Sequence, residues 1–252
     1  PPVPNSREHA EHNANAFQRA MAISKNRSTM YVPPGRYYCW GWGPTSGDNF
    51  GISGLCGEGR NSIIHHVPGA PDDWPWDGCL VMESQAAMHD AFIRDLAFHS
   101  DVDAPVLAAD GYSIKMDNVY VRGAGSGSGM PIDFQRQIGI SLNGQHFTLS
   151  GCQVEFASVG LHVKNAYGVI CDGLNVEYNN LGCLLTNEYQ GRGAGVQING
   201  LYSEGNTRSL HAENTSFNLS GWVGRGSVVV DGCTNSTIDM LTSDRADVEL
   251  RG

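Results

Sequence analysis

Residues 151–156 read GCQVEF, and residues 173–178, which begin 22 positions later, read GLNVEY. A third copy at residues 200–205 reads GLYSEG after an insertion of five residues. In each copy, apolar and polar residues alternate before a Gly or Asn ends the run, which is typical of short β-strands separated by turns. Looser copies lie at residues 93–96, 116–119 and 238–241.

The length of this repeat selects among the known repeat architectures. A unit of 22 residues with three short strands is shorter than a propeller blade, and it carries no helical pattern. It suits one coil of a parallel β-helix, in which each coil lies ~4.8 Å above the last. Equivalent inward side chains would then stack, with Phe156 on Tyr178 and Cys152 in the slot of Leu174 and Leu201. We therefore predict an all-β solenoid.

A series of asparagines recurs at the end of successive coils, at Asn143, Asn165, Asn187 and Asn214. Asparagine tolerates a left-handed backbone at turns, and stacked amides can bond to one another along an axis. We interpret this series as a structural ladder and not as a site.

The N-terminal part differs from the repeats. Residues 10–25 are predicted to form one amphipathic helix, because Phe17, Ala20 and Met21 follow helical spacing. Such a helix would cap the unpaired edge of the stack. Coils with loop insertions then fill residues 29–252, so that residues 1–252 form one β-helix domain. The chain begins at Pro1 without a signal sequence, and we expect it to be a fragment of a longer protein.

Three motifs in this part resemble those of the pectate-lyase-like right-handed β-helix superfamily. Residues 12–20 (HNANAFQRA) resemble its capping helix, residues 31–37 (YVPPGRY) are similar to its PPG turn, and residues 54–64 (GLCGEGRNSII) resemble its first coil. The resemblance implies a single-stranded right-handed parallel β-helix. The superfamily includes polysaccharide lyases, glycoside hydrolases, sugar epimerases and phage tailspike depolymerases. The specific motifs of polygalacturonases and of calcium pectate lyases are absent from this sequence, so neither activity is carried over.

Composition and charge limit the classes of partner that the protein is expected to bind. The chain has 16 basic and 26 acidic residues, a net charge of -10 that argues against a nucleic-acid partner. No apolar stretch reaches the ~18 residues of a membrane-spanning helix, so no membrane partner is expected. The seven cysteines show no CxxC or CxxH spacing, which predicts buried free thiols and no zinc site. We expect no cofactor and leave open a structural or catalytic calcium ion.

The strongest candidate for chemistry is the set Glu155, Glu177 and Glu204, which share one register of successive coils. Strand alternation points all three outward, ~5 Å apart between neighbours. Because like charges so close disfavour simultaneous ionisation, one carboxyl group is expected to keep its proton. A protonated acid beside an ionised carboxylate is the pair that glycoside cleavage uses. The alternative is a solvated ladder, with or without a bound cation.

Candidate substrate-binding residues fall into two groups. His162 and His211 occupy one outward register, and the insertion at residues 188–194 carries Arg192. Four tryptophans lie in Gly-, Pro- and Asp-rich segments predicted as loops, where indole rings could stack on sugars beside Asp73. These tryptophans are Trp40, Trp42, Trp74 and Trp76. The alternative for them is a small loop core or a subunit contact.

The sequence therefore predicts a polysaccharide depolymerase that cleaves glycosidic bonds in a groove along the coils, with hydrolysis by paired glutamates preferred. One alternative is a lyase of the same fold, with a histidine base and a cation to neutralise a uronate. Another is a non-catalytic carbohydrate-binding or structural β-helix. Free thiols and the missing signal resemble phage tailspikes, which leads us to expect a homotrimer on a virion or an extracellular surface.

Overall fold

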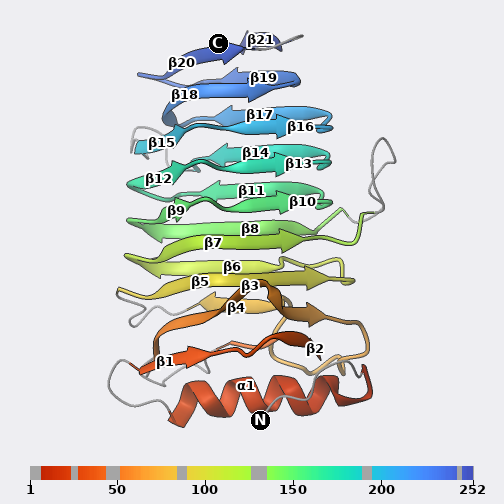
Figure 1. Cartoon of the computed structure of the whole chain (residues 1–252). Helices are drawn as coiled ribbons and strands as arrows, with labels where there is room; N and C mark the ends of the chain where they lie inside the picture. Colours follow the sequence, from red (N-terminus) through yellow and green to blue (C-terminus); the bar gives the residue numbers. More distant parts are fainter. Residues whose placement is uncertain are drawn as a thin grey trace.

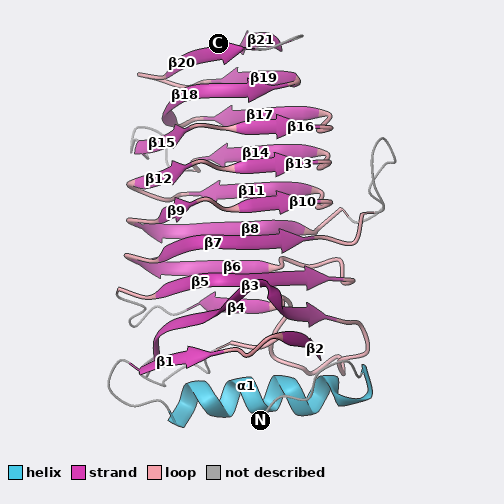
Figure 2. Cartoon of the chain, in the orientation of Figure 1, coloured by secondary structure: helices cyan, strands magenta, loops and turns pink. Residues whose placement is uncertain are grey.

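The computed structural model describes residues 7–23, 28–43, 52–83, 90–125, 135–188, 195–242 and 246–251. A short 3-10 turn, Arg7–His9, leads into one α-helix, α1 (Ala10–Ile23), and all other elements are strands (Figures 1 and 2). The strands of the first half are β1 (Ser28–Tyr31), β2 (Gly35–Cys39), β3 (Ile52–His66), β4 (Leu80–Glu83), β5 (Phe92–Ser100), β6 (Leu107–Tyr112), β7 (Lys115–Arg122), β8 (Ile138–Gln145) and β9 (Thr148–Ser150).

The second half is built from shorter strands. They are β10 (Gln153–Glu155), β11 (Val159–Lys164), β12 (Val169–Asp172), β13 (Asn175–Glu177), β14 (Leu181–Thr186), β15 (Gly195–Asn199), β16 (Tyr202–Glu204), β17 (Arg208–Glu213), β18 (Ser216–Gly224), β19 (Gly226–Asp231), β20 (Thr237–Thr242) and β21 (Ala246–Arg251). The predicted all-β class with one N-terminal helix is confirmed.

All of the strands belong to two parallel sheets. One sheet has 13 strands and follows the order β1-β3-β5-β7-β10-β13-β16-β18-β15-β12-β9, with β2 beside β3 and β20 beside β18. The other has 8 strands, in the order β21-β19-β17-β14-β11-β8-β6-β4. Strands inside the stack, such as β10, β11 and β12, pair with strands from the preceding and following repeats, and the repeats rise from the N-terminus to the C-terminus (Figure 1).

The register confirms the repeat that the sequence shows. Val154 pairs with Val176, and Val176 pairs with Ser203 across the five-residue insertion. Between the first two strands of a repeat the chain turns at a residue with positive φ, for example Gly173 at 67° and Gly200 at 70°, and the equivalent Asn118 at 51° lies within the longer strand β7. Glycine and asparagine adopt this left-handed backbone readily, which explains why they end the apolar runs.

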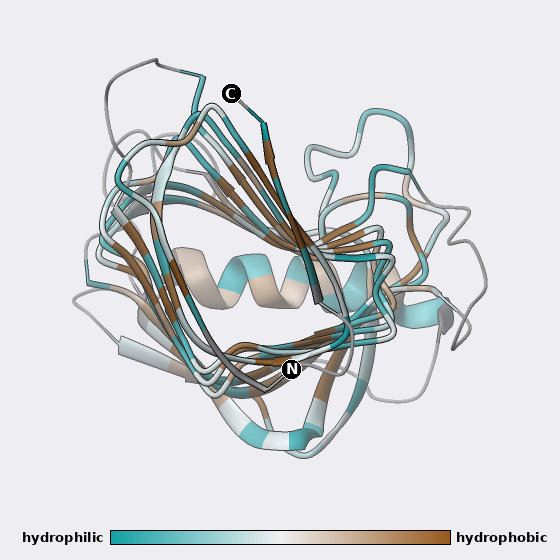
Figure 3. Ribbon diagram, turned by 90° about the horizontal axis from the view of Figure 1, so that it is seen from above, coloured by the Kyte–Doolittle hydropathy of each residue, from teal (hydrophilic) through white to brown (hydrophobic). Residues whose placement is uncertain are grey.

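The core lies between the two sheets and is filled by stacked equivalents. Cys152, Leu174 and Leu201 occupy one slot and are all buried, as the sequence predicts. Val154 and Val176 are fully buried beside them. Burial of such a side chain contributes roughly 1.5–3 kcal/mol, so the column is a major source of stability. Viewed along the stack, the strands of successive repeats superpose (Figure 3).

Helix α1 covers the N-terminal end of the stack (Figures 1 and 3). Its buried stripe of Ala10, Ala14, Phe17 and Met21 follows the 3.6-residue period of an amphipathic helix. The ring of Phe17 stacks on Trp42 with centroids 4.7 Å apart. The helix therefore lies where the sequence predicts a cap, although residues 24 and 25 of the predicted span lie outside the described residues.

The predicted asparagine series is in line for three of its four members: Asn165, Asn187 and Asn214 directly follow residues that pair with one another. The fourth member, Asn143, is not in line with them. Leu142 pairs with Val163, whereas Val163 pairs with Leu185, so the first step advances one residue less and Asn143 falls out of line with Asn165. The Asn165 amide bonds to Glu188 instead of to another asparagine, with Nδ2 3.2 Å from Oε2.

Phe156 and Tyr178 stack as predicted, with ring centroids 5.4 Å apart. They do so on the outside, because φ angles of 58° and 55° turn both side chains out of the core.

A buried asparagine ladder occurs instead at the next turn. Asn179 accepts a hydrogen bond from the Ala157 N–H at 2.9 Å and donates to the Val154 carbonyl at 3.2 Å. One repeat later, Asn206 accepts from the Asn179 N–H and donates to the Val176 carbonyl. These amides satisfy backbone groups that the tight turn buries, which makes them structural.

Two further sequence expectations can be compared with the structure. All seven cysteines are free thiols; five are buried, and Cys56 and Cys233 are half-buried. Burial raises the pKa of Cys152 to about 11. Among the described helical residues, no segment has the length and apolar character needed to cross a bilayer.

Candidate functional site

One column of polar side chains runs along the outer face of the 13-stranded sheet, near the C-terminal ends of its strands. The strand pairings place its members in one register, each on a neighbouring strand. From β2 to β16 they are Tyr38, His65, His99, Arg122, Glu155, Glu177 and Glu204. We call this set the polar column. Its first half is aromatic and basic, and its second half is acidic.

The structure contains the predicted register of the three glutamates. Glu155 on β10 pairs with Glu177 on β13, which pairs with Glu204 on β16. Neighbouring parallel strands lie about 4.8 Å apart, so the backbone positions of adjacent glutamates are separated by about that distance. The glutamates form a line and not a cage: in the described residues, no group of three or more His, Cys, Asp or Glu side chains could hold a metal ion.

Glu155 has the most polar partners of the three carboxylates among the described residues. Its side chain is 12% exposed, and Arg122 Nη1 lies 3.7 Å from its Oε1. The hydroxyl of Tyr120, a buried residue on β7, donates a hydrogen bond to the same oxygen. Burial, together with the hydrogen bond to Glu155, raises the pKa of Tyr120 to about 12. Tyr120 therefore remains a proton donor at every physiological pH, and the negative charge of Glu155 has two stabilising partners.

Glu177 and Glu204 each have one hydrogen-bond donor among the described side chains. Glu177 accepts a hydrogen bond from the Gln153 amide at 3.3 Å, and Gln153 in turn accepts one from the guanidinium of Arg60. Glu204 is exposed and accepts a hydrogen bond from the Tyr202 hydroxyl at 2.5 Å. The three carboxylates thus have different partners, which gives them different environments although their backbone positions are equivalent.

A hydrophobic wall borders the acidic half of the column. The rings of Phe156 and Tyr178 stack at an interplanar angle of 8°, and the Arg122 guanidinium lies over the Phe156 ring at 4.8 Å. A Cβ atom at Gly205 would lie 2.3 Å from the Tyr178 ring, so glycine leaves room for it. Because aromatic residues rarely adopt positive φ, these side chains are held here at a conformational cost.

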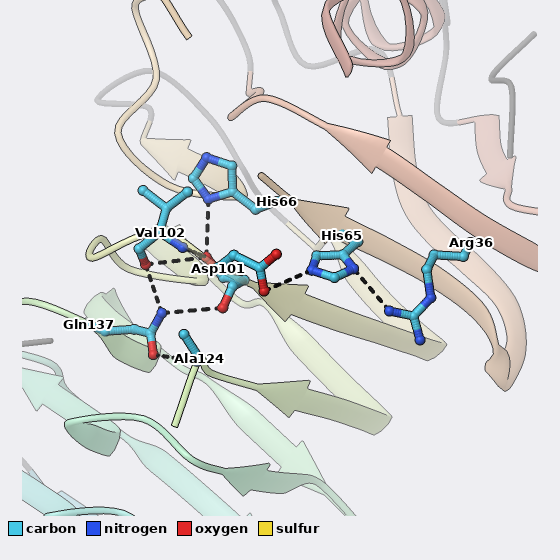
Figure 4. A network of polar contacts seen from close by, with 8 residues as sticks. Arg36, His65, His66, Asp101, Val102, Ala124 and Gln137 are labelled. Atoms are coloured by element: carbon cyan, nitrogen blue, oxygen red, sulfur yellow. Dashed lines mark hydrogen bonds and ion pairs between the residues drawn. The ribbon is translucent and has the colours of Figure 1, made fainter. Parts of the chain in front are cut away.

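The basic half of the column contains a hydrogen-bonded relay (Figure 4). Arg36 Nη1 donates to Nδ1 of His65 at 2.9 Å, so Nδ1 lacks a proton, and His65 is the neutral Nε2–H tautomer. Nε2 lies 3.1 Å from Oδ1 of Asp101. The ring of His99 lies next to that of His65, with centroids 5.7 Å apart. Burial, with a smaller contribution from the positive charge of Arg36, lowers the pKa of His99 to about 3, which leaves it neutral.

A second network fixes the loops beside this half (Figure 4). Ser100 Oγ lies 3.3 Å from Nδ1 of the buried His66, whose pKa burial lowers to about 4. The fully buried Gln137 donates to the Val102 carbonyl at 2.7 Å and accepts from the Ala124 N–H at 2.9 Å. These bonds join the loops that follow β5 and β7, so both loops are held beside the column.

The tryptophans do not form the exposed sugar platform that the sequence predicts. Trp42 is fully buried under Phe17, so its prediction as a substrate-binding residue is wrong. Trp40 and Trp74 are half-buried and meet edge to face at 5.1 Å, and Trp74 Nε1 donates to the Gly41 carbonyl at 2.7 Å. Trp76 is also half-buried and packs over Gly43, where an added Cβ would lie 3.0 Å from its ring. They form the small loop core that was the alternative.

The remaining predicted binding residues lie apart from the glutamates. His162 and His211 share the predicted register with Leu184 between them, but they belong to the 8-stranded sheet. His162 Nε2 is bonded to Thr186 Oγ1 at 3.0 Å, and burial lowers the pKa of His162 to about 4. Asp73 is exposed in the tryptophan loop, and Arg192 lies outside the described residues.

Several residues of this face were missed at the level of sequence, chiefly Tyr120, Arg122, His99 and Arg60. A signal existed for the first two: the looser copy at residues 116–119 continues as Tyr120-Val121-Arg122, and extending it aligns Arg122 with Glu155. Arg60 had no such signal, because β3 departs from the regular register before it reaches the column.

Comparison of the chain with models of protein families, with curated proteins and with solved structures found no match.

Proposed function

We propose that the chain is a right-handed parallel β-helix of the pectate-lyase-like type that depolymerises a polysaccharide along the polar column. The main support for this proposal is the direct pairing of Glu155 with Glu177 on the outer face. Retaining glycosidases use two carboxyl groups about 5–5.5 Å apart, close to the ~4.8 Å between neighbouring parallel strands. Hydrolysis by this pair is therefore the preferred reaction.

The different partners of the two carboxylates suggest their roles. Glu155 is the nucleophile, because the Tyr120 hydroxyl and Arg122 both stabilise its negative charge. Glu177, held by one neutral amide, is the acid that protonates the leaving oxygen and then activates water to release the sugar. The Phe156–Tyr178 wall has both ring faces occupied, so it borders the sugar chain and restricts water access without stacking on it.

A lyase reaction is the second candidate, favoured by one observation. The neutral ring of His99 lies 5.7 Å from the Tyr120 ring, and Arg60 and Arg122 flank that tyrosine. β-Elimination from a uronate needs a neutral base, a proton donor and a cation to neutralise the carboxylate. His99, Tyr120 and the arginines supply these three functions in one place.

Substitution of Glu177 by Gln tests the proposal. The expected result is a loss of reducing-end release of about 100-fold or more, the size of a general-acid contribution. Glu155→Gln should cause a comparable loss. Glu213→Gln is the matched control, because Glu213 is exposed on β17 of the other sheet and should retain full activity.

The readout also separates the alternatives. If the products absorb as unsaturated uronates, and if Glu177→Gln forms them as fast as the wild type does, the reaction is elimination and not hydrolysis. Unchanged hydrolysis in both glutamine variants would remove the pair from the mechanism. No cleavage across a broad glycan panel would reject the depolymerase and favour a carbohydrate-binding or structural protein.

A further inference from the structure

Strand β3 contains a bulge that changes the direction of its side chains. Gly59 pairs with Leu96 and Ile63 with Ala97, so β3 advances four positions while β5 advances one. The bulge is well fixed: Gly59 has a φ of 63°, and the fully buried Ser62 hydroxyl accepts from the Glu58 N–H and donates to the Val32 carbonyl. Bulges often re-aim a side chain next to a functional site, and this one carries Arg60.

Arg60 reaches from the bulge into the centre of the candidate site. Its guanidinium lies 4.0 Å from the centre of the Tyr120 ring. It also donates a hydrogen bond to Gln153, a residue 93 positions later in the chain, and Gln153 is bonded to Glu177. Arg60 is therefore connected to both proposed catalytic glutamates, through Tyr120 to Glu155 and through Gln153 to Glu177.

The charge of Arg60 is not neutralised within the part of the chain that the structure describes. Both of its partners there are neutral, an aromatic ring and an amide, and no carboxylate forms an ion pair with it. The neighbouring Arg122 lies over the Phe156 ring, and its ion pair with Glu155 is long, at 3.7 Å. The protein has a net charge of -10 and therefore many carboxylates that could pair with an arginine. Because Arg60 is exposed and its described partners are neutral, its charge is available to bind an anion from outside the protein.

We propose that Arg60, assisted by Arg122, binds the anionic group of an acidic sugar residue next to the cleaved bond. The inference rests on the proposed function and adds the substrate class: a polysaccharide that carries carboxylate or sulfate groups. A guanidinium has five N–H donors in a planar fork, and the fork can bind either group through two parallel hydrogen bonds. Stacking on Tyr120 holds the fork in place, which lowers the entropy lost on binding.

The test is binding, which needs no cleavage. Affinity electrophoresis would compare polygalacturonate and alginate with the same polymers after chemical reduction of their carboxyl groups, and dextran sulfate with dextran. The expected result is that at least one anionic polymer binds about tenfold or more tightly than its neutral counterpart. The comparisons of polygalacturonate and alginate with their reduced forms test binding of carboxylate groups. The comparison of dextran sulfate with dextran tests binding of sulfate groups.

Three variants assign the effect to Arg60. Arg60→Gln should remove most of the preference for the anionic polymer and leave binding of the neutral polymer unchanged. Arg60→Lys should restore part of it, because the charge remains while the fork is lost. Arg94→Gln removes an equal charge from an exposed arginine of β5 that lies outside the polar column, and it should change the preference less than twofold.

The outcomes separate this inference from the proposed function. Equal losses in Arg60→Gln and Arg94→Gln, or no preference for any anionic polymer, would overturn the inference. Cleavage of a neutral polysaccharide that depends on Glu177 would also overturn it, while the proposed function would stand. Preferential binding of an anionic polymer without any cleavage would retain the anion site and reject the depolymerase. If Arg60→Gln fails to fold, Arg60→Lys still tests the fork.

Discussion

The two halves of the 13-stranded sheet are built differently. Strands β3, β5 and β7 are long, β3 carries a bulge, and a long loop connects β3 to β4. By contrast, β10, β13 and β16 have three residues each and end in tight turns (Figure 1). The first half of the polar column is basic and aromatic, and the second half is acidic. Regular repetition places identical carboxyl groups side by side. A departure from it, the bulge in β3, brings Arg60 into contact with Gln153, which is bonded to Glu177.

The two halves also end differently. Helix α1 covers the first repeat, and its Phe17 packs on the buried Trp42. At the other end of the stack, the outer strand β21 of the 8-stranded sheet carries exposed Val248 and Leu250. The first half therefore derives stability from a cap that is not part of the repeat. The second half depends on stacked equivalents and on turn residues that satisfy buried backbone groups.

The largest expected effect tests the dependence of the first half on its cap. Phe17→Ala should lower the free energy of unfolding by about 3–5 kcal/mol, because it removes a nearly fully buried ring and leaves a cavity against Trp42. Urea denaturation followed by circular dichroism measures the loss. Arg19→Ala, an exposed position on the same helix, is the control and should stay within about 0.5 kcal/mol. A loss below 1 kcal/mol for Phe17→Ala would show that the helix does not stabilise the stack.

The next effect tests the tight turns of the second half. Asn179→Ala removes a buried amide and leaves the Ala157 N–H and the Val154 carbonyl unsatisfied, which should cost about 2–3 kcal/mol. Asn165→Ala is the matched comparison at a more open turn. It should cost about 1 kcal/mol, mainly because alanine disfavours the φ of 52° there. The reverse order in urea denaturation would contradict the assignment of the structural ladder to Asn179 and Asn206.

The smallest effect concerns pH and returns to the first half. The pKa of His99 is about 3 in the folded protein and about 6.5 when unfolded, so between these values the unfolded state binds more protons. The stability contribution is thus fully present above pH 6.5 and is lost as the pH falls toward 3. His99→Gln should retain about 1–2 kcal/mol more of its pH 7 stability at pH 5.5 than the wild type does. Parallel pH dependence in both proteins would contradict the lowered pKa.

Much of the second half could be predicted from the sequence, because each repeat carries its own strands and turns. The alignment of Glu155 with Glu177 needed only the repeat length and strand alternation. The same reasoning placed Phe156 inside, because alternation assumes that the strand continues. The strand ends at Glu155, and a positive φ at Phe156 turns the ring outward. Periodicity therefore predicts register well and predicts the residue after a strand poorly.

Less of the first half could be predicted from the sequence, because its segments do not follow the repeat. The tryptophans lie in segments rich in Gly, Pro and Asp, which favoured exposed loops, but those loops fold back on themselves and on α1 so that Trp42 is buried. The composition of a segment indicates whether it favours regular secondary structure, but it does not indicate what the segment packs against. The same limit applies to the relay of Arg36, His65 and Asp101, which joins three different strands or loops.

The sequence by itself determined the parallel stacking, the N-terminal helix and the register of the acidic residues, because these follow from local periodicity repeated along one chain. Only the tertiary structure decided that Arg60 reaches Gln153, that Asn179 and Asn206 form the buried ladder and that the charged face is divided into a basic and an acidic half. Those features depend on a bulge, on unequal loop lengths and on contacts between distant residues. A periodic pattern carries no information about any of the three.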